Sequence, residues 1–154
     1  MQGVCTAVLV HRGVRLGAAA LELAIALPVL VLLAVGVADF GRMFYTGIAV
    51  ANAARAAAEY GSHAVANSTD TSLINQAGRN DAADAGSVTV TSERFCRCPD
   101  GTAPDCGTGT CTAPYDQPEV FVTARAVKTI ALIIRYPGLP QTLTFRDSAT
   151  FRAQ

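Results

Sequence analysis

The sequence predicts an α+β protein in which one long N-terminal helix packs against a small antiparallel sheet of three to four strands. An apolar, alanine-rich stretch with helical spacing runs from Ala18 to Tyr60. Short β-branched segments of alternating polarity follow it, and segments rich in proline and glycine separate them. With 154 residues, the chain can form one modest domain in addition to this helix.

Residues 18–38 are apolar for long enough to cross a bilayer as a helix. Their only charged side chain is Glu22, and a carboxylate near the end of a membrane helix indicates a functional role unless it merely reaches the headgroups. His11, Arg12 and Arg15 precede the stretch, which predicts a cytoplasmic N-terminus and an extracytoplasmic remainder. A cleaved secretory signal is the alternative, but its apolar core would be shorter and would end at a small-residue site.

The helical pattern continues beyond the apolar stretch to Tyr60, and Gly61 fits a C-terminal cap. Within it, apolar residues recur at three- and four-residue steps and form one helix-packing stripe: Phe40, Phe44, Ile48 and Ala51. The alanine-rich part of this helix allows close approach of another element. Two partners remain open for this face, the chain's own head or neighbouring subunits.

The head, residues 62–154, begins with a polar loop and a short helix over 71–85. Thr69 or Asp70 is the expected N-cap of that helix, and Gly86 is its expected stop. Strand patterns follow over 87–95 and 119–126, with a longer apolar run over 127–136. Two further strand segments are predicted at 141–145 and 148–152.

Four cysteines cluster in a loop over residues 96–118, hereafter the disulfide loop: Cys96, Cys98, Cys106 and Cys111. An even number of cysteines in a small exported region predicts two disulfides. Cys96 and Cys98 share one face of a strand, so a bond between them would be strained. Two connectivities remain, 96–106 with 98–111 or 96–111 with 98–106. A four-cysteine zinc site is the alternative, but the spacing differs from common zinc motifs, and we expect no metal.

The N-terminal part resembles the TadE-like family, minor pilins (pseudopilins) of tight-adherence, Flp-type, type IV pilus systems. The resemblance covers residues 17–61 closely and rests on Gly17 followed by Glu22, on Leu27-Pro28, on Asp39-Phe40-Gly41-Arg42 and on Ala51-Asn52-Ala53-Ala54-Arg55. Val120 to Arg152 resembles the family's C-terminal strands more loosely, and the middle is not covered. The leader departs from the family pattern because residues 4–10 are apolar.

The resemblance implies a pilin-like fold and a class III leader, residues 1–17, which a prepilin peptidase removes between Gly17 and Ala18. It also implies that Glu22 then pairs with the new amine of Ala18 on a neighbouring subunit. Other pilin subunits would bind through the N-terminal helix, which membrane lipid holds before assembly. The protein would be a single-pass membrane protein first and a pilus or cell-surface subunit afterwards.

Net charge and the lack of known sequence motifs argue against several other classes of function. Removing residues 1–17 leaves ten basic against twelve acidic residues, so no surface for nucleic acid is expected. The sequence lacks the common hydrolase, metalloprotease and nucleotide-binding signatures, so we expect neither an enzyme nor a cofactor. Two alternatives to a pilus subunit remain. One is a membrane-anchored extracytoplasmic binding module, whose disulfide loop recognises a ligand without polymerising. The other is a pseudopilin of a secretion machine.

Overall fold

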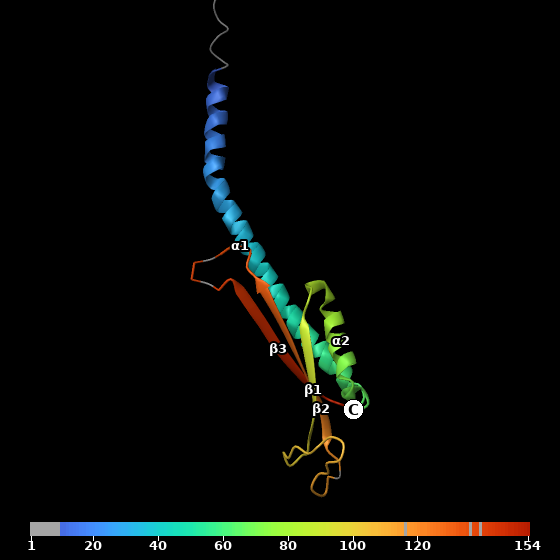
Figure 1. Cartoon of the computed structure of the whole chain (residues 1–154). Coiled ribbons are helices and arrows are strands. Elements are labelled where there is room, and N and C mark those ends of the chain that lie inside the picture. Colours follow the sequence, from blue (N-terminus) through green and yellow to red (C-terminus); the bar gives the residue numbers. More distant parts are fainter. Residues whose placement is uncertain (1–9, 116, 136, 139) are drawn as a thin grey trace, which may run out of the picture. The chain divides into compact units, whose positions relative to one another are not determined.

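The computed structural model describes residues 10–115, 117–135, 137–138 and 140–154, with side chains from Gly17 onward. Residues 1–9 of the predicted leader, with Cys5, lie outside the described residues. The chain divides into two compact units, residues 1–40 and 41–154. The elements, in chain order, are α1 (Val10–Ser62), η1 (Asn67–Thr69), α2 (Thr71–Asp81), η2 (Ala83–Ala85), β1 (Thr89–Arg97), β2 (Glu119–Ala131) and β3 (Thr142–Arg152). The predicted α+β class is confirmed: a long apolar helix packs against a three-stranded antiparallel sheet (Figure 1).

Helix α1 begins at Val10, eight residues before the predicted mature N-terminus, and runs through Pro28 to Ser62. Within the second unit, one face of α1 is buried and consists mainly of alanine: Ala49, Val50, Ala53, Ala54, Ala57 and Ala58. These positions recur at three- and four-residue steps, which places them on one side of the helix. Because alanine side chains are short, the helix axis can lie close to the sheet.

The sheet has the strand order β1-β2-β3, and both pairings are antiparallel. Strand β2 lies in the centre, where Val122 pairs with Arg94 on one side and with Phe151 on the other. The two segments predicted at 141–145 and 148–152 form one continuous strand, β3, which passes through Arg146 and Asp147. Both of these residues are exposed on a strand that pairs on one side only, so their polarity does not interrupt the sheet.

The core lies between the sheet and the C-terminal part of α1, residues 50–58. It combines alternate strand residues with small helix residues. Val90, Val122, Ala124 and Ala126 supply the sheet side, and Ile74 of α2 closes the cluster. Gly78 allows α2 to approach α1, because a Cβ there would lie 2.6 Å from the carbonyl oxygen of Ala53.

Helix α2 has Asp70 as its N-cap, one of the two residues expected there. The Asp70 carboxylate accepts the backbone N–H groups of Ser72 at 3.0 Å and Leu73 at 3.1 Å. The helix ends at Asp81, four residues earlier than predicted, and the chain continues as η2 to Gly86, where φ is 81°. Around η2, the Tyr45 hydroxyl donates to the Asp84 carboxylate and the Lys128 ammonium donates to the Ala85 carbonyl. These contacts tie this end of α2 to α1 and β2.

Candidate assembly helix and disulfide loop

The N-terminal part of α1 is strongly apolar and exposes its side chains. The helix is long and apolar enough over Gly17–Ser62 to cross a membrane, and none of its most apolar window is buried within the protein. In the first unit, Leu21, Ile25, Leu30 and Leu33 are each more than half exposed. A helix that exposes so many large apolar residues indicates a membrane anchor.

Gly17, Ala18 and Glu22 lie on this apolar helix and are all exposed. Ala18 and Glu22 are four residues apart, so their side chains lie on the same face, one turn apart. Glu22 borders a shallow groove of about 460 Å³ that Ile25, Ala26, Val29 and Leu30 also line. Within the described residues, a Cβ added at Gly17 would meet nothing within 4 Å. The Gly17–Ala18 bond lies inside α1, and both residues are exposed.

Three of the four residues of the predicted helix-packing stripe are largely exposed. Phe40, which ends the first unit, is 58% exposed. In the second unit, Phe44 and Ile48 are each 60% exposed, and Ala51 is half-buried. The head instead covers the alanine face that includes Ala53 and Ala57. Of the two partners left open by the sequence, the structure therefore gives the head a different face of α1.

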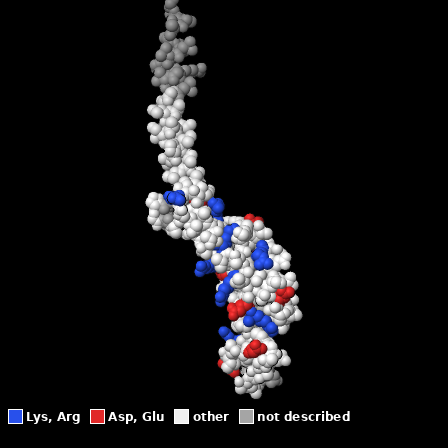
Figure 2. Space-filling view, viewed as in Figure 1, with Lys and Arg blue, Asp and Glu red and all other residues white. Residues whose placement is uncertain are grey.

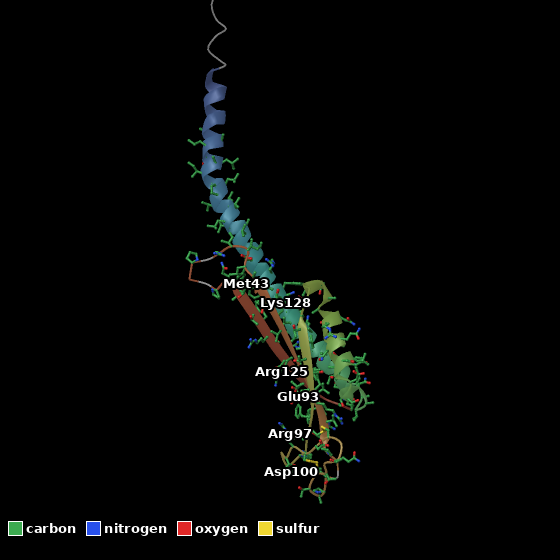
Figure 3. The ribbon with its side chains drawn as sticks, viewed as in Figure 1. Met43, Glu93, Arg97, Asp100, Arg125 and Lys128 are labelled. Atoms are coloured by element: carbon green, nitrogen blue, oxygen red, sulfur yellow. A yellow bond between two sulfur atoms is a disulfide. The ribbon has the colours of Figure 1, made fainter. Side chains whose placement is uncertain are left out.

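The disulfide loop begins within the last residues of β1 and is closed by two bonds. Cys96 pairs with Cys106 and Cys98 pairs with Cys111, with Cα–Cα distances of 5.2 and 5.7 Å. This is the first of the two connectivities that the sequence left open. Because these sulfur atoms are bonded to each other, they offer no thiolate for the alternative zinc site. Figure 3 shows Arg97 and Asp100 at this end of the sheet, close to the disulfides.

Two aspartates shape the loop between the cysteines. Asp100 accepts the Thr102 hydroxyl at 2.7 Å and the Thr102 backbone N–H at 2.9 Å, and these bonds lower the pKa of Asp100. Asp105 accepts the backbone N–H of Gly107 at 2.8 Å and that of Thr108 at 3.1 Å, which lowers the pKa of Asp105. Both carboxylates are thus anionic turn acceptors at neutral pH.

The sequence did not reveal a pocket of about 730 Å³ between the disulfide loop and the end of the sheet. Arg94, Thr108, Tyr115, Glu119 and Arg152 line it, together with glycine and proline residues of the loop. These residues come from β1, the loop, β2 and β3, so no local motif brings them together. One partial signal existed, because Arg94 and Cys96 are two residues apart and therefore lie on the same face of β1.

Charged side chains are distributed unevenly along the chain. On the face shown in Figure 2, basic and acidic residues are interspersed over the second unit, without a broad surface of one sign. Between Ala18 and Ala38, Glu22 is the only charged residue. The described residues thus combine one strongly apolar helix with a polar, disulfide-stapled α+β head, an arrangement that suggests a membrane-anchored protein.

Comparison with known families narrows this class. Residues 17–59 match the family model described as TadE-like protein, which confirms the resemblance over the N-terminal helix. No curated protein and no solved structure matches the chain significantly. The matched residues include Gly17, Ala18, Glu22 and the whole helix-packing stripe. The match and the apolar helix together fit a membrane-anchored protein related to tight-adherence pili.

Proposed function

We propose that this protein is a TadE-like minor pilin (pseudopilin) that takes part in assembling a tight-adherence type IV pilus. The observation that carries the proposal is Glu22, the one charge in an apolar helix segment that matches the TadE-like family. In this proposal residues 1–17 are the leader, residues 18–61 are the assembly helix with its membrane span at 18–38, and residues 62–154 are the extracytoplasmic head.

Processing by a prepilin peptidase is the first step of the proposal. Cleavage after Gly17 would create an α-amine on Ala18, one helical turn from Glu22. A small residue at position 17 suits a peptidase that works at the end of a membrane helix. The exposed position of Gly17 on α1 supports this role, because a peptidase must reach the bond that it cuts.

The second step is an ion pair between subunits. On insertion scales a carboxylate at the centre of a membrane helix costs about 2.5–3.5 kcal/mol, which is an upper limit for Glu22 near the helix end. Opposite charges 4 Å apart attract by about 4 kcal/mol at an effective dielectric constant of 20. A neighbour's Ala18 amine would therefore offset the cost of Glu22, whereas an unpaired subunit would keep that cost. The pair favours the assembled state in a way that neither charge does alone.

Packing of the assembly helix is the third step. Phe44 and Ile48 are each 60% exposed and so present apolar area on this part of α1. Contiguous exposed apolar surface indicates an interaction site. We propose that neighbouring pilin subunits cover the helix-packing stripe in the filament, while the alanine face holds the head.

The test is incorporation of Glu22 variants into sheared surface filaments. Glu22→Ala and Glu22→Gln should be processed normally, as judged by intact mass, but should fall by about tenfold or more in filaments, since a pair worth 1.4 kcal/mol already gives tenfold. Glu59→Ala is the matched control, because Glu59 is an exposed glutamate on the same helix but outside the membrane span. Normal incorporation of both Glu22 variants would refute the ion pair. Absence of the unmodified protein from filaments would favour the membrane-anchored binding module or a secretion pseudopilin.

A further inference from the structure

The pocket beside the disulfide loop is built from parts that are fixed relative to each other. Arg94 and Cys96 lie on one face of β1, and the Cys96–Cys106 bond draws the loop back toward that face. The turn after Cys106 is tight: the backbone N–H of Gly109 donates to the Asp105 carbonyl at 2.9 Å. A Cβ on Gly109 would lie 2.4 Å from the Pro104 Cβ, so this wall requires glycine at 109.

Among the described residues that line the pocket, two cations stand against one carboxylate. Arg152 donates to Glu119 at 2.7 Å, so these two side chains neutralise each other. Arg94 is the third charged residue of the lining. Its Nε is buried and, within the described residues, has no hydrogen-bond acceptor. Asp105 is close enough to Arg94 for the arginine to contribute to its lowered pKa, but Asp105 Oδ1 already accepts from Gly107 and Thr108.

A buried guanidinium N–H without an acceptor is costly, and most such groups in proteins are satisfied. A ligand carboxylate is the acceptor that arginine binds best, because two parallel N–H groups match its two oxygens. The Arg94 side chain lies on the pocket wall, so a rotation toward a bound anion would relieve the unsatisfied donor. The position of Arg94 therefore selects for a ligand that carries a carboxylate.

The remaining lining fits a ligand with several hydroxyl groups. Thr108, Thr110 and Gln117 provide groups that both donate and accept, and Glu119 provides an acceptor. Tyr115 is 50% exposed, so its ring offers a flat apolar surface to the C–H face of a sugar. A volume of about 730 Å³ lies within the range of small-molecule sites.

We propose that this pocket binds an acidic carbohydrate, with the sugar carboxylate on Arg94 and the sugar ring against Tyr115. The disulfides hold the pocket in its binding shape, so less conformational freedom is lost on binding. This site is independent of filament assembly, because its residues lie in the head and none belongs to the assembly helix.

The test uses the full chain in detergent and measures binding of D-glucuronate, D-glucose and N-acetylglycine by calorimetry or by NMR shifts. Glucuronate should bind at least about tenfold more tightly than glucose, because glucose lacks the carboxylate and loss of a charged hydrogen bond costs about that much. It should also bind more tightly than N-acetylglycine, which keeps the carboxylate but lacks the sugar ring and its hydroxyl groups. Arg94→Gln should weaken glucuronate binding by about tenfold or more. Arg125→Gln is the matched control, since Arg125 is an exposed arginine on β2 that does not line the pocket.

Each outcome supports or overturns the proposal. Equal binding of glucuronate and glucose, or no glucuronate binding at millimolar concentration, would contradict the proposal that Arg94 binds the sugar carboxylate. Equal binding of N-acetylglycine would assign the pocket to peptide carboxylates instead of sugars. If Arg94→Gln fails to fold, Tyr115→Ala replaces it, because Tyr115 is exposed and outside the core. This variant should lose at least about threefold in glucuronate affinity, and unchanged affinity would contradict ring stacking.

Discussion

Gly78 sets how closely α2 can approach α1, and its replacement by alanine gives a sharp test of the packing. The glycine is fully buried in α2. An added Cβ would lie 2.6 Å from the carbonyl oxygen of Ala53, 3.0 Å from the Cβ of Ala57 and 3.1 Å from a methyl group of Val90. The closest of these atoms belongs to the backbone of α1, so no side-chain rotation relieves the contact.

Two effects of opposite sign decide the result. Alanine favours a helix over glycine by about 1 kcal/mol. Overpacking a close contact costs about 1–3 kcal/mol, and a backbone contact at this distance belongs at the upper end. The variant Gly78→Ala should therefore lose about 2 kcal/mol of unfolding free energy, which lowers the melting temperature by about 8 °C for a domain of this size.

Thermal unfolding followed by circular dichroism measures this change. Gly41→Ala is the matched control: it is also a helical glycine, but a Cβ there would meet nothing within 4 Å. It should therefore keep or raise the melting temperature. A Gly78→Ala variant that melts at or above the temperature of the unmodified protein would refute the close approach of α2 to α1.

Three further predictions address the leader, the disulfide loop and the cap of α2. Gly17→Trp should leave an uncut precursor whereas Gly17→Ala is processed, and intact mass tells these forms apart; a processed Trp variant would contradict the assigned cleavage site. Replacing Cys98 and Cys111 together by serine should destabilise the head by about 3 kcal/mol, because this bond closes a loop with a sequence separation of 13; an unchanged denaturation midpoint in urea would show that the loop does not contribute. The pKa of Asp70 is lowered, first by the Ser72 hydroxyl and next by the Leu73 N–H, so its contribution to stability is complete above the unfolded pKa near 4 and is lost as pH falls through the lower folded value. The difference in melting temperature between the unmodified protein and Asp70→Asn should therefore shrink as pH falls from 6 to 2. A constant difference would refute the claim that the negative charge of Asp70 stabilises the N-cap.

Local patterns were sufficient to predict the fold class and the elements with strong periodicity. The alanine spacing in α1, the N-cap at Asp70 and the alternation in β1 and β2 all depend on neighbours in sequence. The same kind of local pattern predicted some element boundaries wrongly. Arg146 and Asp147 suggested a break between two strands, because the sequence does not show that β3 pairs on one side only. Helix α2 ended early because the turn at η2 is held by Tyr45 and Lys128, which are distant in sequence.

Some candidate site residues could likewise be predicted from local sequence patterns, whereas others are brought together only by the fold. Gly17, Ala18 and Glu22 form a local pattern, so the sequence was enough to single them out. The pairing of Cys96 with Cys106 depends on how the loop folds back over β1, which spacing alone left open. The pocket residues Arg94, Glu119 and Arg152 come from three strands, and only the register of the sheet brings them to one end.

The most direct measurement is the N-terminal sequence of the protein isolated from membranes of a strain with a working prepilin peptidase. A first residue of Ala18 is the expected result, because only that cut places a free amine one turn before Glu22. A protein that begins at any other residue, or that retains its leader, would contradict the ion pair on which the assembly proposal depends.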